Sequence, residues 1–413
     1  MKRILLILIP AILIVFLLVF KLFVTKNIAE KNKTEGISLY DSSKYELASE
    51  KFMQSLHWQK SDTEAQLYLA KSFFYLNELV KSDSLCDVLI PIYNNADIYN
   101  LKGKVAAGMN QHTEAISFYN TAIEKDPEFF YAYHNRGISY ASMGEYKKAI
   151  TDYELAKELN SSADVLLKSV EARTQLMDYK GAIEDYNKIL ENDANNTEIL
   201  YGRGRLKFVI NDLEGAITDF TQVISLAPQN GEAYYYRGVS YAKQKDFNSA
   251  KTDLLKAKEN KSNIEKSSYN LAKIYFEEQN KKQAQKELKN IDFETIDNQL
   301  KVDILQLQVS FAFSESNFTQ ANNMLNQALE INPEKYELYY YRAITHEKLK
   351  TFAQGIDDLT VCIKNKAMLK ESHYVRGILY INIRNTPAAC SDFKISANMG
   401  HEHARVLLNK HCS

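Results

Sequence analysis

The stretch YYYRGVSYAK, residues 234–243, places an arginine and a glycine directly after three tyrosines. An exposed Arg237 beside Gly238 could bind a phosphate group, because a guanidinium forks around an anion and a glycine lets the anion approach the backbone. Such a corner would indicate an enzyme. The alternative is that Arg237 holds two structural elements together, and the other parts of the chain bear on that choice.

A metal site is the second chemistry that the residue types suggest. His401, His403, His411 and Cys412 lie close together at the end of the chain. Residues two apart on a helix point about 200° apart, so His401 and His403 do not converge on one ion. The sequence also lacks a phosphate-binding loop, a nucleophile elbow and a metalloprotease helix. We therefore expect no metal, no cofactor and no catalytic residue.

The composition favours long helices and disfavours a nucleic-acid partner. The 413 residues include 51 Lys plus Arg against 52 Asp plus Glu, a formal net charge of −1, and no long basic run. A protein that neutralises nucleic-acid phosphates would carry a basic patch. Only 14 Gly and 6 Pro occur, while Tyr occurs 27 times. Few turn formers in a chain of this length indicate helices joined by short loops.

The N-terminus predicts a membrane anchor. Residues 4–20 are apolar, and after Lys21 three more apolar residues extend the segment to Val24. A helix over 4–24 would measure about 31 Å and would cross a hydrocarbon core of about 30 Å. We predict an uncleaved single-pass anchor there, with the membrane as a partner. A cleaved signal peptide is the alternative, but only the weak sequence NIA at 27–29 follows the apolar run.

Two signals disagree about the side of the membrane. Four lysines between positions 21 and 33 follow the apolar run and favour a cytoplasmic domain by the positive-inside rule. A short basic head, Lys2 and Arg3, directly before the apolar run is typical of exported chains. We predict that the remainder of the chain lies on the extracytoplasmic, periplasmic side.

A 34-residue repeat occupies the rest of the chain. YHNRGISYASMGEYKKAITDYELA at 133–156 and YYYRGVSYAKQKDFNSAKTDLLKA at 234–257 align without gaps. Small residues recur at intervals of 33, 34 or once 37 residues, and they mark eleven units at Ala48, Ser82, Ala115, Ala149, Ala182, Ala216, Ala250, Ala284, Ala321, Gly355 and Ala389. Twelve residues before each stands a second, mostly small residue, at Gly36, Ala70, Gly103, Gly137, Val170, Gly204, Gly238, Ala272, Val309, Ala343 and Gly377. Four residues after each marker stands a mostly bulky one.

Each unit reads as two helices of about 12 to 14 residues joined by a tight turn. A lone helix of this length is marginal in water, so the units must stack into one core. The spacing and residue pattern resembles the tetratricopeptide repeat family. The resemblance implies an all-α, right-handed superhelical solenoid of about eleven helix pairs over residues 29–400. It also implies a concave face that binds peptides or other proteins. Residues 401–413 are expected to form a helix that caps the last repeat.

The repeat answers the question about Arg237. An arginine precedes the small residue in five units, and an aspartate follows sixteen residues later in each of the five. The pairs are Arg136 with Asp152, Arg203 with Asp219, Arg237 with Asp253, Arg342 with Asp358, and Arg376 with Asp392. The six other units have an aspartate there only once, at Asp185. A catalytic arginine would occur once, so we predict partly buried ion pairs between the two helices of a unit.

Aromatic residues of the first helices are the candidate binding residues. Positions three before and four after the small residue should face the concave surface, and in the C-terminal half they hold Tyr201, Tyr235, Tyr269, Tyr340, Tyr374, Phe208, Phe276 and Phe313. A tyrosine offers a rigid apolar ring with a polar tip, which suits a binding surface. The alternative is that these rings mostly pack against neighbouring repeats. One subset of the family grips a C-terminal carboxylate with Lys three before the small residue and Asn directly after it, and no unit here supplies both.

Cys390 and Cys412 are candidates for a disulfide. They lie ten residues before and twelve residues after Gly400, where one helix should end and the last should begin. Two antiparallel helices would place them at similar heights, and the bond would fit an oxidising compartment. Two buried free thiols are the alternative. Cys86 and Cys362 fall on core positions and read as small apolar side chains.

The sequence as a whole predicts a membrane-tethered scaffold, not an enzyme, that binds a partner protein or peptide on its concave face. An accessory or docking subunit of an envelope transport, secretion or assembly complex is a second hypothesis. A third is a carbohydrate binder or an enzyme that uses the tyrosine-lined groove. Three extra residues around NIDFETIDNQ, 290–299, are expected to distort the stack and to divide it into two arms.

Overall fold

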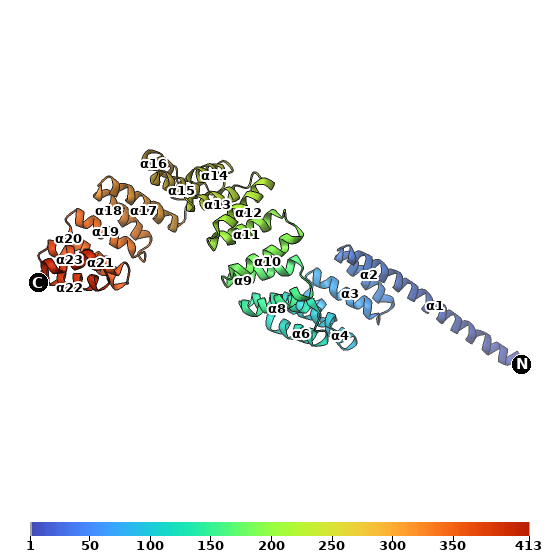
Figure 1. Cartoon of the computed structure of the whole chain (residues 1–413). Helices are drawn as coiled ribbons and strands as arrows, with labels where there is room; N and C mark the ends of the chain where they lie inside the picture. The colour runs from blue at the N-terminus through green and yellow to red at the C-terminus, as the bar shows by residue number, and fades with distance from the viewer. Residues whose placement is uncertain (1, 413) are drawn as a thin grey trace. The chain divides into compact units, whose positions relative to one another are not determined.

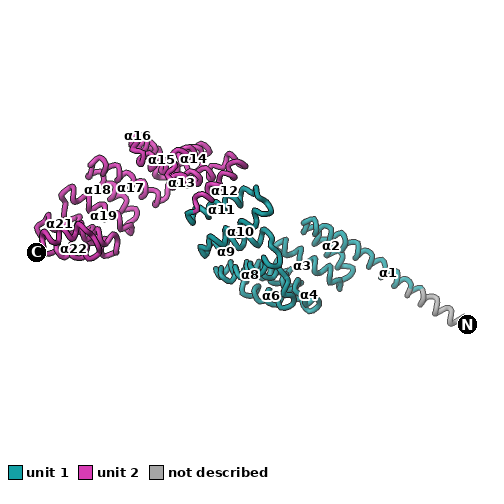
Figure 2. The backbone as a smooth tube through the Cα atoms, in the orientation of Figure 1, with its two compact units in different colours: residues 1–211 teal, residues 212–413 magenta. Residues whose placement is uncertain are grey.

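In this computed structural model the chain is a succession of helices, and within each unit a helix packs against the one that precedes it (Figure 1). The structure describes the backbone of residues 2–412 and the side chains of residues 13 and 16–412. This part of the chain forms 23 helices and no strand. It falls into two compact units that divide between Asn211 and Asp212 (Figure 2).

The first unit holds eleven helices. They are α1 Lys2–Asp41, α2 Tyr45–Trp58, α3 Thr63–Tyr75, α4 Leu79–Tyr93, α5 Ala96–Gly108, α6 His112–Lys125, α7 Phe130–Ser142, α8 Tyr146–Leu159, α9 Ala163–Gln175, α10 Tyr179–Asn192 and α11 Thr197–Val209. The second unit holds twelve, and the last of them, α23, follows the final repeat. They are α12 Leu213–Leu226, α13 Gly231–Lys243, α14 Phe247–Glu259, α15 Ile264–Glu277, α16 Lys281–Lys289, α17 Asn298–Ser314, α18 Phe318–Ile331, α19 Glu337–Lys348, α20 Phe352–Lys364, α21 Leu369–Asn382, α22 Thr386–Asn398 and α23 Glu402–His411.

Odd-numbered helices up to α21 are the first helices of the repeats, and even-numbered helices are the second helices. This agrees with the predicted all-helical solenoid of helix pairs. The superhelical hand was expected from the resemblance and stays a prediction.

A left-handed residue ends every first helix, seven residues after the small residue. These residues have φ between 55° and 76°, and they are Ser43, Asn77, Asn110, Gly144, Met177, Asn211, Lys245, Gln279, Ser316, Lys350 and Arg384. In the second repeat the backbone N–H of Glu78 donates to the carbonyl of Phe73 at 2.8 Å, which satisfies an orphan carbonyl of the helix end. A constant turn fixes the angle between the two helices of each repeat.

The core of a repeat is the contact between its small residue and the bulky residue of its second helix. In four repeats a ring packs on a glycine, in the pairs Gly36 with Phe52, Gly103 with Tyr119, Gly137 with Tyr153 and Gly377 with Phe393. A Cβ added to Gly377 would lie 2.5 Å from Cε1 of Phe393, so the ring occupies the space of a missing methyl group. Where the small residue is alanine, as at Ala272 and Ala343, the partner is an aliphatic leucine, Leu288 or Leu359. In these repeats a smaller residue on the first helix is matched by a larger side chain on the second, so the spacing between the two helices stays the same.

The fifth repeat does not follow this pattern, and its bulky side chain extends into the next repeat. It combines Val170 with Tyr186, so a valine stands where the ring would meet a glycine on the first helix. The Tyr186 hydroxyl instead reaches α11, where a Cβ added to Gly202 would lie 2.6 Å from it. Burial raises the pKa of Tyr186.

Arginine–aspartate pairs join the two helices of four repeats in the way that the spacing suggested. In each, Nε and Nη2 of the arginine donate to the two carboxylate oxygens of the aspartate, which gives a bidentate pair. For Arg237 and Asp253 the two distances are 2.7 and 2.9 Å, and Nη1 of Arg237 donates to Thr221 at 3.0 Å. The hydrogen bond to Asp253 raises the pKa of Arg237. The fifth predicted pair, Arg203 with Asp219, belongs to two different units and stays a prediction.

Asp185, which has no arginine sixteen residues before it, obtains cations from elsewhere. Lys157 of the preceding repeat donates to it at 2.7 Å, and Nε of Arg173 donates at 3.1 Å. Ser169 stands at the arginine position and donates its hydroxyl proton at 2.6 Å. Since Asp185 is 1% exposed, these contacts are what allow its charge to be buried.

The three extra residues after Ala284 are absorbed locally. The second helix α16 is cut to nine residues and the next first helix α17 is lengthened to seventeen. Ile291 of the connecting segment is buried, and Phe293 packs against the cores on both sides of it. The two compact units divide between Asn211 and Asp212 instead of at this insertion.

The predicted membrane anchor is corrected by the structure. Among the described residues no helix is both long and apolar enough to cross a membrane. The predicted single-pass membrane location, with its extracytoplasmic domain, is therefore wrong, and neither the anchor at 4–24 nor the membrane as a partner is supported. The apolar run is the beginning of α1, which continues unbroken into the first repeat, where Ser55 donates to the carbonyl of Ala29 at 2.8 Å. Of the anchor prediction, the side chains of residues 4–12, 14 and 15 lie outside the described residues.

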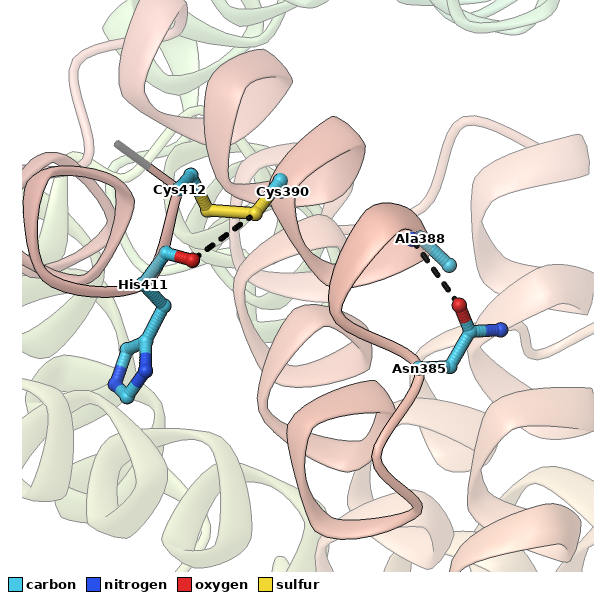
Figure 3. The surroundings of a disulfide bond; sticks show 5 residues. All are labelled: Asn385, Ala388, Cys390, His411 and Cys412. Carbon is cyan, nitrogen blue, oxygen red and sulfur yellow. Dashed lines mark hydrogen bonds between the residues drawn. A yellow bond between two sulfur atoms is a disulfide. The ribbon is translucent and has the colours of Figure 1, made fainter.

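A short helix and a disulfide close the C-terminal end (Figure 3). α23 packs its buried Ala404 against α22, and Leu407 and Leu408 contact the same core cluster as Phe393. The sulfurs of Cys390 and Cys412 are bonded, with Cα atoms 5.6 Å apart. The Sγ of Cys390 also lies 3.7 Å from the carbonyl oxygen of His411, a contact rather than a hydrogen bond because a disulfide sulfur carries no proton. Cys86 and Cys362 are buried free thiols.

We predict that Gly377 and Phe393 are energetically coupled. Gly377→Ala should destabilise the protein by about 1–3 kcal/mol because the new methyl group overlaps the ring. Gly377→Ala with Phe393→Leu recreates the alanine–leucine pair of the preceding repeat, so it should melt at a higher temperature than Gly377→Ala alone. Thermal melts of the wild type, both single variants and the double variant measure the coupling. Strictly additive losses would contradict it.

Removing either partner of the Arg237–Asp253 pair should cost about 3 kcal/mol, because the other charge stays behind at a site that is largely buried. Arg237→Ala and Asp253→Ala should each lower the Tm, and the double variant should lower it little further. Thermal melts of the four proteins test this, with Lys256→Ala, an exposed residue of the same helix α14, as the control. If the two single losses add, the pairing is wrong.

If the disulfide is present, two of the four cysteines should resist alkylation until a reductant is added. Alkylation of the denatured chain should label two cysteines without reductant and four with it. The Cys390→Ser, Cys412→Ser double variant should lose about 3 kcal/mol of stability, as expected for a loop of this length. Reductant should lower the Tm of the wild type and leave that of the double variant unchanged. Four labelled thiols before reduction would refute the bond.

Candidate functional site

The first helices carry the candidate site on the side turned away from the second helices. We call this side of α1, α3, α5, α7, α9 and α11 in the first unit, and of α13, α15, α17, α19 and α21 in the second, the first-helix face. The small residue faces the second helix of its repeat. The side chains three before, one after and four after the small residue lie along the first-helix face. Those positions determine what a ligand would meet.

The five predicted tyrosines are half-buried there. Burial raises the pKa of Tyr235 and of Tyr269 to about 12, and it also raises the pKa of Tyr340. The ring of Tyr374 stacks on His401 with centroids 4.1 Å apart, so the capping helix covers part of it. Tyr201 lies in α11 with Arg205 over its ring at 5.9 Å. These rings are set into the wall of the face and present only one side of themselves to a ligand.

The three predicted phenylalanines have different surroundings. Phe276 packs edge-to-face on Phe311 at 4.6 Å and belongs to a core cluster. Phe208 is half-buried in α11, at the end of the first unit. Phe313 packs edge-to-face on Phe318 at 5.7 Å and lines an open hollow of the second unit. Of the three, Phe313 is the one that contributes to a concave surface.

This hollow, with a volume of about 560 Å³, lies between the first helices α17 and α19. Val309 and Leu325 form its floor, where Val309 stands in place of a smaller residue. Its walls combine apolar and polar side chains, and they are Gln306, Ser310, Phe313, Tyr341 and Ile344. A hollow of this size with an apolar floor and a few polar groups on the rim has the character of a binding site for a side chain.

The sequence prediction missed three of these wall residues, Ser310, Tyr341 and Ile344. Tyr341 and Ile344 stand two before and one after Ala343, whereas the prediction considered only the positions three before and four after. Gln306 and Ser310 stand on one side of α17 at a spacing of four, together with Phe313 three further on. Adding the position directly after the small residue would have found Ser310 and Ile344.

The first unit has a more polar hollow of about 610 Å³ on α7, α8, α9 and α10. Tyr146, Tyr153 and Tyr186 supply its rings, and Lys168 and Glu171 form an ion pair at 2.9 Å on its rim. Nearby, His134 is buried with its Nε2 3.0 Å from Asp164, and burial lowers the pKa of His134. None of these contacts places a nucleophile beside a base, so the arrangement supports binding rather than a named reaction.

Within the described residues no group of three or more His, Cys, Asp or Glu is arranged to hold a metal ion. The rings of His401 and His403 lie 6.1 Å apart and both lie next to Tyr374.

Comparisons with known proteins identify the repeat. Three family models, each a tetratricopeptide or TPR repeat, match residues 103–144, 130–162 and 201–263. RNA polymerase II-associated protein 3 of Xenopus tropicalis is 30% identical over 152 residues, covering 36% of this chain and 23% of that protein. Hsp70-Hsp90 organizing protein 2 of Arabidopsis thaliana is 30% identical over 122 residues, covering 29% and 21%. The matches therefore span between a fifth and a quarter of the length of these two relatives.

Solved structures show a similar succession of helices. The TPR protein YrrB, described as having an unusual peptide-binding site, matches with 24% identity and a TM-score of 0.38, over 42% of this chain and 90% of that one. The Cut9–Hcn1 hetero-tetramer of the APC/C matches with 12% identity and a TM-score of 0.44, over 93% and 96%. Residues 103–162 and 201–263 therefore match tetratricopeptide repeats, and the flanking helix pairs share the 34-residue spacing, the turns and the small–bulky contacts of these segments.

Proposed function

We propose that this protein is an interaction scaffold that binds an extended segment of a partner protein along its first-helix face. The observation that carries the proposal is the open hollow between α17 and α19, lined by Phe313, Tyr341 and Ile344. An apolar side chain of the partner would fill it, while Gln306 and Ser310 would bond to the partner's backbone.

The lining favours a peptide over a sugar or a reacting substrate. A carbohydrate site or an active site needs several converging polar groups, and this hollow has two uncharged ones among five apolar side chains. The likeness to an Hsp70-Hsp90 organizing protein supports a role of the same class, because that protein is named for bringing other proteins together. The segment bound here is a proposal about this chain alone.

Filling the hollow should abolish binding without unfolding the protein. Ser310 is exposed on α17, so Ser310→Trp places an indole in the hollow and leaves the core intact. Peptides selected by the intact chain from a random displayed library should bind Ser310→Trp at least tenfold more weakly, as measured by calorimetry. Gln327→Trp, exposed on the second helix α18, is the matched control and should bind as the wild type does.

Three outcomes would contradict this proposal. The intact chain could select no peptide, the selected peptides could bind Ser310→Trp as well as the wild type, or Gln327→Trp could weaken binding equally. The thermal melt of each variant should match that of the wild type within a few degrees, which separates a blocked hollow from a damaged fold.

A further inference from the structure

A small cationic pocket lies on the first-helix face of the first unit. It has a volume of about 220 Å³ and is formed by side chains of α1, α3, α5 and α7. The residues that matter for its chemistry are Tyr40, Lys71, Phe74, Tyr75, Asn100 and Lys104. Lys71 and Lys104 stand directly after the small residues of their repeats, a position that the sequence analysis considered only for an asparagine.

The charges in this pocket do not cancel. Nζ of Lys71 lies 3.0 Å from Oδ2 of Asp97, so that lysine is already paired. Among the described residues no carboxylate lies within ion-pair distance of Lys104, whereas the neighbouring Lys102 contacts both Asp83 and Asp87. Burial, and then the charge of Lys71, lowers the pKa of Lys104. The pocket therefore carries one uncompensated positive charge that a ligand anion would stabilise.

Aromatic rings hold this charge in place. Nζ of Lys104 lies 4.5 Å from the centroid of Phe74 and 5.2 Å from that of Tyr75. Tyr75 is itself fixed, because it stacks on Tyr45 at 4.4 Å and contacts Tyr40 at 6.1 Å. A preorganised cation costs little conformational entropy when an anion binds to it.

A hydrogen-bond donor stands beside the cation. Asn100, 8% exposed, accepts a hydrogen bond at Oδ1 from Nδ2 of Asn135 at 2.8 Å. This contact leaves the amide nitrogen of Asn100 to serve as a donor on the wall of the pocket. Asn100 and Lys104 are four residues apart on α5, so both can reach one anion.

We propose that this pocket binds the side-chain carboxylate of an aspartate or glutamate in the partner segment, next to an aromatic or aliphatic residue that packs on Tyr75. One negative charge matches the one unpaired lysine. The segment need not end there, because α7 contributes both to this pocket and to the polar hollow of about 610 Å³ farther along the same unit. The order of these residues is the reverse of that in the family subset that binds a C-terminal carboxylate. In that subset Lys precedes and Asn follows the small residue, whereas here Asn100 precedes and Lys104 follows it. The inference rests on the proposed function, whose own evidence lies in the second unit.

The test selects peptides from a random library displayed with its C-terminus fused, so that only side chains can supply a carboxylate. The intact wild-type chain should enrich sequences with Asp or Glu beside an apolar residue. A selected peptide should bind Lys104→Gln about tenfold more weakly and Lys104→Arg within about threefold of the wild type. Replacing its acidic residue by the amide should weaken wild-type binding by the same factor and leave binding to Lys104→Gln unchanged.

Lys273→Gln is the matched control. Lys273 also follows the small residue of its repeat and lies over a tyrosine ring, Tyr269, at 5.5 Å, but it is exposed and lies in the other unit. It should retain wild-type affinity for these peptides. If peptides are selected but their affinity does not depend on Lys104 and the acidic residue together, this inference fails while the proposed function stands. If the chain selects no peptide at all, both fail.

Discussion

Everything in this molecule depends on the distance between the two helices of a repeat, and a single contact sets that distance. A small residue on the first helix contacts a bulky one on the second. At Gly377, the ring of Phe393 occupies the space that a methyl group on that residue would need. Each first helix then ends at a left-handed residue a fixed seven positions later. Because contact and turn recur together, the exposed sides of successive first helices come into line. Within each unit, that alignment creates the face on which the candidate site of that unit lies.

Charge has a secondary, reinforcing role. The bidentate arginine–aspartate pairs sit at the edge of the small–bulky contact and satisfy carboxylates that would otherwise be buried alone. They explain why Arg237 recurs as part of the framework. Lys104 shows the opposite case, a cation that lies over the rings of Phe74 and Tyr75 with no carboxylate of the described residues within ion-pair distance. Unbalanced charge is therefore a better guide to a ligand here than the presence of charged residues as such.

Sequence alone predicted the parts that follow from periodicity. The helix pairs, their order and the spacing of Arg237 and Asp253 are periodic features, so eleven copies made them visible. The boundary between the two compact units, at Asn211 and Asp212, could not be predicted from the sequence, because the repeat pattern is unbroken there. The insertion near Ile291 looked like a division, but its apolar residues simply extend the core. The apolar run at the N-terminus was interpreted from its length, whereas α1 continues through it into the first repeat.

The candidate site was less predictable because it depends on departures from the repeat. Whether a ring lines a hollow depends on the sizes of the side chains around it. In the hollow of the second unit, Val309 and Leu325 form the floor. Phe276 and Phe313 occupy equivalent positions and both pack against a core cluster, yet Phe313 also lines the hollow. A count of positions along the repeat does not reveal that difference.

The contact between Lys157 and Asp185 has a consequence for how such an array can change over evolutionary time. The aspartate belongs to one repeat and its closest cation to the repeat before it, while Tyr186 of the same repeat reaches Gly202 of the one that follows. Deletion of the fifth repeat would leave Lys157 without the carboxylate of Asp185. It would also leave an empty space beside Gly202, where the Tyr186 hydroxyl now lies. Duplication or deletion of the fifth repeat would thus break specific contacts at both of its joints.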